Sequence, residues 1–312
     1  MTNEALLVLN AFVIRGDSSP PAGDRRARPG YNVNRAGQGI EDETTTDRTL
    51  ALSSAPQFEW EAFDQYWRKI HGPKILFPDG PADEQTPLLA YYLQQHRIPA
   101  GPCSEFAPPY AAPLAADGLL PRHPAADCEP YQRPVFDGLA QLGYRTRADL
   151  ESFFQVKGTK YGEKIMPDEA VFIRGFGFHV AEEHVVMQNG DRRRDAIILL
   201  KLHQRAAGMS RESFRGRWMA QHAALVRAHP LAKLLVRRYA QLVNVSQPED
   251  RLYDPVGDRY DGVGVYSFAN MNDCEDFIAG EAHASIVEDE QLFAPQTAFF
   301  TALNYVICDR TD

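Results

Sequence analysis

The stretch FDQYWRKIH at positions 63–71 has a counterpart later in the chain, FRGRWMAQH at positions 214–222. In both stretches a phenylalanine, a tryptophan and a histidine follow one another at intervals of four residues. This spacing places the three side chains on one face of a helix. A face of such specific composition, present twice, predicts that the chain contains one structural unit in two copies.

Three further landmarks recur in the same order around these stretches. They are an apolar, strand-like run at 5–14 and 196–202, an aromatic-Asp-Gly sequence at 136–138 and 260–262, and Asp-Glu-x-x-Phe at 168–172 and 289–293. Four matches in register indicate an internal duplication with a period of about one domain. We therefore expect two homologous domains, at 1–190 and 191–312, with their boundary in the polar stretch 188–195.

The two predicted domains differ in their connections. The first carries two insertions, at about 16–57 and at about 99–134, and both are rich in proline. Long irregular segments within a compact domain are either functional lids or disordered. The sequence leaves both readings open for these two segments.

The hydrophobic pattern of each half reads strand, helix, strand, strand, helix, strand. Ser210 and Thr146 are expected to cap helices, as is Asp273, and a last strand of the first half is expected at 171–180. This order is typical of the ferredoxin-like α+β class, so the predicted fold is two βαββαβ domains packed sheet to sheet as an intramolecular barrel. Such packing would leave an apolar chamber beside an imidazole.

Composition excludes several classes of function. The chain has 33 Lys and Arg against 42 Asp and Glu, a formal charge of -9, which argues against a nucleic-acid partner. No stretch approaches ~18 consecutive apolar residues, so no membrane-spanning helix is expected. The four cysteines lie far apart and form no CxxC pair, which favours reduced thiols and a cytoplasmic protein.

Three residues are the candidates for catalysis. His71 and His222 each end one of the repeated helical faces, where a neutral imidazole can exchange a proton near neutral pH. Asp168 could orient a histidine or accept a proton. The alternative is that each histidine is a hydrogen-bonded core residue and that the aspartate caps a loop.

The predicted substrate-binding residues are the neighbours of these histidines on the same helices. They are Phe63, Tyr66, Trp67, Phe214, Arg217 and Trp218. The aromatic rings could form the wall of a cavity for a flat substrate, or simply core. Tyr66 and Arg217 occupy equivalent positions, so a phenol in one half replaces a guanidinium that could hold a carboxylate in the other.

A metal site is not expected. His179 and His184 lie five positions apart on a predicted strand, so their side chains point to opposite faces. The sequence also lacks the HExxH, Walker, GxSxG and dinucleotide-binding motifs.

The segment from Gly208 to His222, with Tyr260-Asp-Gly and Asp289-Glu-x-x-Phe293, resembles the EthD family of the dimeric α+β barrel superfamily. The first half is similar to a diverged second copy, with insertions that the family pattern lacks. The resemblance implies an enzyme of aromatic or polyketide-type metabolism. It leaves open whether the chain forms a homodimer.

Three functions follow from this resemblance. The leading one is a cofactor-independent lyase or decarboxylase that uses a pocket histidine as general acid and base, with the first half slightly favoured as its location. The alternatives are a cofactor-free or haem-assisted oxygenase on an aromatic substrate, and a non-catalytic binding or accessory protein.

Overall fold

The structure, a computed structural model, describes residues 5–15, 60–78, 80, 83–99, 101–104, 107–108, 136–189 and 194–311. The predicted insertion at about 16–57 lies outside these ranges, as does most of the one at about 99–134. The predicted boundary at 188–195 is described only in part. The division into two domains stays a prediction.

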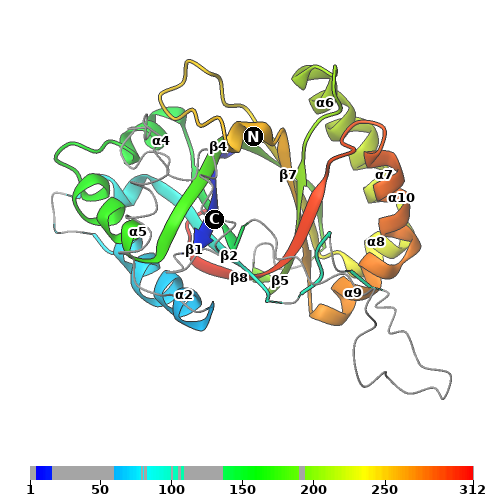
Figure 1. The fold of residues 1–312 in the computed structure, drawn as a ribbon, viewed down its shortest axis with the longest axis horizontal. Coiled ribbons are helices and arrows are strands. Elements are labelled where there is room, and N and C mark those ends of the chain that lie inside the picture. Colours follow the sequence, from blue (N-terminus) through cyan, green and yellow to red (C-terminus); the bar gives the residue numbers. More distant parts are fainter. Residues whose placement is uncertain are drawn as a thin grey trace, which may run out of the picture.

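Eight strands form one closed antiparallel barrel, which occupies the centre of the molecule (Figure 1). In chain order the strands are β1 (Leu7–Arg15), β2 (Leu89–Arg97), β3 (Gly138–Tyr144), β4 (Ile173–Gln188), β5 (Ile197–His203), β6 (Arg238–Asn244), β7 (Gly262–Phe268) and β8 (Ala298–Asp309). Around the barrel the order is β1-β3-β2-β8-β5-β7-β6-β4, and β4 pairs with β1 to complete the ring.

The prediction of two ferredoxin-like domains packed sheet to sheet is wrong. The first four strands and the last four are joined edge to edge by hydrogen bonds, between β2 and β8 and between β4 and β6. In these ladders His96 pairs with Leu303 and Ala181 with Asn244. The physical reason is that pairing satisfies the backbone groups of edge strands, which would otherwise stay open. The result is a single barrel wall.

The interior of the barrel is filled by side chains. One apolar cluster takes buried residues from every strand, for example Phe12 from β1, Leu139 from β3 and Phe300 from β8. The ring of Phe12 lies 5.1 Å from that of Phe136 and 5.1 Å from that of Tyr260, centroid to centroid. Side chains from the two halves therefore meet in one packed apolar cluster inside the barrel.

Short helices cover the outside of the barrel on two opposite sides (Figure 1). The helices beside the first four strands are α2 (Trp60–Tyr66), η1 (Trp67–His71), α3 (Gly72–Leu76), η2 (Thr86–Leu88), α4 (Arg147–Phe153), η3 (Tyr161–Ile165) and α5 (Met166–Phe172). Those of the second half are α6 (Arg211–Arg217), η5 (Trp218–His222), α7 (Ala223–Ala228), α8 (Pro230–Leu235), η6 (Gly257–Arg259), α9 (Met271–Ala279) and α10 (Glu281–Glu290). None of the helices in the described ranges has the length and apolar character needed to cross a bilayer.

Several predicted helix ends are confirmed and others are shifted. Ser210 accepts a hydrogen bond from the Ser213 backbone N–H, and Thr146 forms a capping box at the start of α4. The helix predicted to begin at Asp273 is instead capped by Asn270, three residues earlier. The strand predicted at 171–180 begins at 173 because α5 continues through Phe172.

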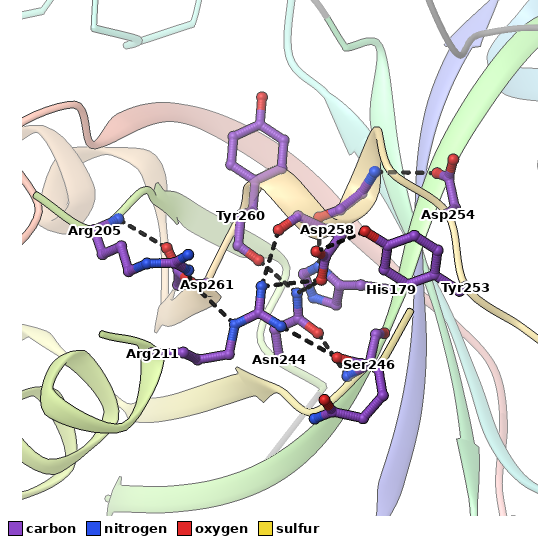
Figure 2. Close-up of polar contacts among 12 residues, drawn as sticks. His179, Arg205, Arg211, Asn244, Ser246, Tyr253, Asp254, Asp258, Tyr260 and Asp261 are labelled. Carbon is purple, nitrogen blue, oxygen red and sulfur yellow. Dashed lines mark hydrogen bonds and ion pairs between the residues drawn. The ribbon is translucent and has the colours of Figure 1, made fainter. Parts of the chain in front are cut away.

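The segment between β6 and β7 is held in place by contacts of charged side chains (Figure 2). Arg211 binds the Ser246 carbonyl at 3.1 Å and the carboxylates of Asp258 and Asp261 at 2.9 and 3.2 Å. Asp254 accepts backbone hydrogen bonds from Phe178 at 2.7 Å and Gly257 at 3.0 Å. These contacts hold the segment so that its apolar side chains join the interior cluster.

Replacement of Phe12 by alanine tests the packed interior. Phe12 has no exposed surface, so Phe12→Ala is expected to lower the free energy of unfolding by about 3–5 kcal/mol. Phe77 is 66% exposed, so Phe77→Ala is expected to change the free energy of unfolding by no more than about 0.5 kcal/mol. Urea denaturation of both variants measures the difference. Equal effects would contradict a filled barrel.

Candidate functional site

Each repeated stretch forms a helix with a π-turn at its centre. In the first half the Gly72 backbone N–H bonds to the carbonyl of Trp67, five residues earlier, and in the second half Ala223 bonds in the same way to Trp218. The spacing alone predicted regular helices, so the π-turns are a difference from expectation. A π-turn is rare and often marks a functional site. Here each π-turn ends at its motif histidine.

A glutamine side chain on the facing strand holds each π-turn. The Gln94 amide on β2 donates to the Trp67 carbonyl at 2.9 Å and to the Tyr92 hydroxyl at 2.8 Å. Gln241 on β6 donates in the same way to the Trp218 carbonyl at 2.8 Å and to the Tyr239 hydroxyl at 3.0 Å. Sequence reasoning missed both glutamines. The signal that could have found them is Tyr-x-Gln, which occurs at 92–94 and again at 239–241.

The tryptophans of the two stretches are core residues that pack on bare backbone. The indole of Trp67 lies against Gly138 and that of Trp218 against Gly262, and a Cβ at either glycine would collide with the ring. This contact explains why glycine follows aspartate at both strand entrances. Phe63 and Phe214 are also fully buried, and each ring packs beside its tryptophan. All four predicted wall residues are thus buried, and Trp67 also lines the cavity described below.

The predicted histidines each meet an aspartate. His71 Nδ1 lies 2.8 Å from an Asp168 oxygen, and His222 Nδ1 lies 2.8 Å from an Asp289 oxygen. A carboxylate accepts a hydrogen bond, so each imidazole is assigned as the Nδ1–H tautomer, with a lone pair on Nε2. The arrangement is a His–Asp dyad in each half, in which the aspartate orients the ring.

The equivalent residues Tyr66 and Arg217 both bind the dyad aspartate. The Tyr66 hydroxyl donates to the second oxygen of Asp168 at 2.7 Å, and Lys74 pairs with the same oxygen. Arg217 lies 2.5 Å from the second oxygen of Asp289. The dyad carboxylate is therefore bound by a phenol from this position in the first half and by a guanidinium in the second.

The electrostatics of the first dyad keep its imidazole neutral and its carboxylate charged. Burial alone would raise the pKa of Asp168, but hydrogen bonds from His71, Lys74 and Tyr66 lower it to about 2. Burial lowers the pKa of His71 below its ordinary value of 6.5, and the Asp168 carboxylate opposes this shift. Burial and the hydrogen bond to Asp168 raise the pKa of Tyr66 to about 12. Near neutral pH, His71 is consequently a base with a free lone pair.

A small apolar cavity of about 50 Å³ lies between the helices and the outer face of the first four strands, and His71 lines it. Its other walls are Leu9, Ala11, Val13, Trp67, Ile75, Tyr92, Ala140, Leu142, Phe153, Phe154, Tyr161, Ile165, Glu169, Phe172, Ile173 and Phe176. An engineered protein cavity of roughly 150 Å³ binds benzene, and the cavity beside His71 is smaller than that. The hydrogen bond to Asp168 occupies Nδ1 of His71, so Nε2 is the ring nitrogen that it leaves available.

The second half has charged side chains at the corresponding place. In the β5–β7 ladder Lys201 pairs with Gly264 and His203 with Gly262, where the β1–β3 ladder pairs Ala11 with Ala140 and Val13 with Gly138. Lys201 is 1% exposed and its ammonium lies 2.6 Å from a carboxylate oxygen of Glu290. Sequence reasoning missed the Lys201–Glu290 ion pair because Lys201, like His203, lies within an apolar run of strand residues. The two halves therefore differ in the polarity of the space beside their dyads.

No metal centre is evident in the described ranges, where no group of three His, Cys, Asp or Glu side chains is arranged to hold an ion. His179 lies inside the barrel, where it contacts Asn10 at 3.0 Å and the Gly257 carbonyl at 3.1 Å. His184 lies on the same strand, 3.4 Å from Glu182.

The comparison with known proteins gives one family. A model of the EthD domain family matches residues 55–175 and 206–297, and no curated protein sequence matches the chain significantly. The structure of an anthrone oxidase-like protein aligns at 9% identity, covering 99% of this chain and 96% of that one, with a TM-score of 0.47. A chlorite dismutase variant from Candidatus Nitrospira defluvii aligns at 11% identity, covering 96% and 92%, with a TM-score of 0.38.

Titration of His71 tests the electrostatics of the first dyad. We expect the pKa of His71, measured by NMR of its imidazole protons, to lie below the ordinary value of 6.5. Asp168→Asn removes the negative charge that opposes the effect of burial, so the pKa is expected to fall further in this variant. Glu61→Gln, at an exposed carboxylate on α2, should leave the pKa unchanged. A rise in the Asp168→Asn variant would contradict the dyad.

Proposed function

This chain belongs to the EthD family, and from that premise we propose that it is an oxygenase that needs no organic cofactor and oxidises an aromatic carbon acid. The observation that carries the proposal is the His71–Asp168 dyad, whose histidine lines an apolar cavity. A general base in a dry site and a place for a small apolar gas are the two requirements of this chemistry.

His71 is the proposed base. Its Nε2 takes a proton from an activated C–H or phenolic O–H of the substrate, and the resulting imidazolium is stabilised by the Asp168 carboxylate 2.8 Å from Nδ1. Tyr66 and Lys74 both contact the other carboxylate oxygen, which keeps Asp168 ionised and fixed in position. They are therefore proposed as positioning residues.

The cavity is the proposed site for dioxygen. Empty apolar cavities in proteins bind apolar guests such as xenon, and dioxygen is an apolar diatomic molecule. Electron transfer from the substrate carbanion to O₂ and loss of water would convert a CH₂ group into a carbonyl, as CH₂ + O₂ → C=O + H₂O. The substrate loses two C–H hydrogens and O₂ is reduced to the carbonyl oxygen and water, so atoms and electrons balance.

The base strength limits the substrate class. An imidazole whose pKa lies below 6.5 is a weak base, so the substrate must have an unusually acidic C–H, such as a CH₂ between aromatic rings or beside a phenol or ketone. A lyase or decarboxylase would use the same proton step, and its CO₂ is also a small apolar molecule. Consumption of O₂ is therefore what separates the two reactions.

The haem-assisted version of the oxygenase does not fit the residues around His71. The cavity of about 50 Å³ is much smaller than a porphyrin ring, and its walls are close-packed aromatic side chains. No step of the proposed reaction therefore passes through haem.

Oxygen consumption tests the base. With anthrone, a ketone whose CH₂ lies between two aromatic rings, we expect O₂ uptake equal to the product formed, and a loss of about 100-fold or more in kcat/KM in His71→Gln. His184→Gln, at a partly exposed histidine that lies 3.4 Å from Glu182, is the matched control and should keep full activity. Product formation from a carboxylated substrate without O₂ uptake would instead indicate the lyase.

Filling the cavity tests the dioxygen site. Ala140 lines the cavity and is 6% exposed, so Ala140→Val is expected to occupy part of its volume. The KM for O₂ should rise by about tenfold, equivalent to ~1.4 kcal/mol, with a smaller change in the KM for the aromatic substrate. Ala284→Val, at an exposed position on α10, is the control. An unchanged KM for O₂ would place dioxygen elsewhere.

A further inference from the structure

The histidine on β2, His96, has a hydrogen-bond acceptor on each side of its ring. Its Nδ1 lies 2.8 Å from a carboxylate oxygen of Asp64 on α2, and its Nε2 lies 3.2 Å from Oε1 of Gln94. The ring has no exposed surface, so these two contacts are shielded from solvent. The roles of the two partners therefore decide how many protons the ring carries.

Gln94 can only accept a hydrogen bond from the ring. Its amide nitrogen is placed by two other contacts, 2.9 Å from the Trp67 carbonyl and 2.8 Å from the Tyr92 hydroxyl. A flipped amide would point its oxygen at the Trp67 carbonyl, and two acceptors at that distance repel each other. Oε1 is therefore the atom that faces His96, and a hydrogen bond between them requires an N–H at Nε2.

Asp64 accepts from the other side of the ring. Its second carboxylate oxygen lies 3.3 Å from the Arg68 guanidinium. Burial alone would raise the pKa of Asp64, but the hydrogen bonds and charges of His96 and Arg68 lower it. An ionised carboxylate requires an N–H at Nδ1 as well. Only the doubly protonated imidazolium satisfies both contacts of His96.

The remaining groups that face His96 are two aromatic rings and one cation. The Trp67 indole stacks on it, with centroids 4.2 Å apart and planes at 8°, and such a face attracts a cation. The Tyr305 ring on β8 lies 4.8 Å away, and burial raises the pKa of its hydroxyl, which is therefore neutral. Burial lowers the pKa of His96, as does Arg68, whereas Asp64 raises it. The indole face and the Gln94 carbonyl act in the same direction as Asp64.

We propose that His96 carries a proton on both ring nitrogens at neutral pH and acts as a positioning residue for the His71–Asp168 dyad. The contacts run from the ring to Gln94 Oε1, and from the Gln94 amide to the Trp67 carbonyl. That carbonyl accepts the hydrogen bond of the π-turn whose last residue is His71. The proton on Nε2 thus holds the amide in the orientation that supports the turn.

Loss of this proton acts against the turn. The neutral ring keeps the N–H that faces the Asp64 carboxylate, because a charged acceptor binds more strongly than a neutral one. Nε2 then presents a lone pair to Gln94 Oε1, and these two acceptors repel each other. The amide withdraws from the Trp67 carbonyl, so the first dyad loses support as the pH rises through the pKa of His96. This regulation rests on the proposed function of His71.

The second half has the same glutamine without such a ring. Val243 stands two residues after Gln241, where His96 follows Gln94, and Arg215 takes the place of Asp64 after the motif phenylalanine. Gln241 nevertheless holds its π-turn in the same way. A π-turn of this kind therefore forms without a histidine, and the charged ring is an addition in the half that has the apolar cavity.

Nitrogen-15 NMR of the histidine rings in the full chain tests the charge. At pH 7 we expect both ring nitrogens of His96 to carry a proton, with signals that vanish in His96→Gln. Asp64→Asn removes the paired charge and should raise the acid dissociation constant of the ring by about tenfold or more. Glu61→Gln, the matched change at an exposed position of α2, should leave it unchanged. A single ring proton at pH 7 in the parent chain, or equal effects of the two carboxylate variants, would overturn the proposal.

The connection to the dyad is read from the His71 ring in the same titration. Its signals should show an additional inflection at the pKa of His96, and this inflection should be lost in His96→Gln and in Gln94→Met. His184→Gln, at a partly exposed histidine, should keep it. Absence of the inflection in the parent chain, or its retention in folded Gln94→Met, would show that His96 does not position the dyad. These measurements need no substrate, so their failure is distinguishable from a failure of the oxygenase activity.

Discussion

The buried amide of a strand glutamine is the interaction on which both dyads depend. Gln94 and Gln241 each use their two N–H groups on a tryptophan carbonyl and a tyrosine hydroxyl. A carbonyl displaced by a π-turn would be costly to bury without a donor. The amide supplies that donor from the sheet and so fixes the helix to the barrel at the turn that carries the histidine.

Closure of the barrel decides where chemistry can take place. All eight strands contribute side chains to the apolar cluster inside the barrel, whereas the cavity that His71 lines is outside the wall, between a sheet face and its helices. Each half has its own such layer, and the layers have different side chains at matching ladder positions. Small apolar residues leave a cavity in one half, whereas Lys201 and Glu290 place an ion pair in the other. One scaffold thereby presents two electrostatic environments to two similar dyads.

Much of this could be predicted from sequence, and the limits have physical causes. The repeated Phe-x3-Trp-x3-His face predicted that both histidines lie on helices, and the recurring Asp-Glu-x-x-Phe sequence drew attention to Asp168, which the structure places 2.8 Å from His71. Periodicity reports which face of an element is buried but not which strands become neighbours, so the joining of β2 to β8 and of β4 to β6 was missed. Lys201 was missed for a related reason, because a lysine within an apolar strand looks like an exception until its partner Glu290 is known.

The ring of strands also limits how this protein can associate with others. Each of the eight described strands already has a neighbour on both sides, so none presents an open row of backbone N–H and C=O groups. Strand addition, by which many proteins recruit extended peptides or copies of themselves, would require an existing ladder to be broken. Any assembly that leaves the barrel intact has to use its helical flanks or its connecting segments.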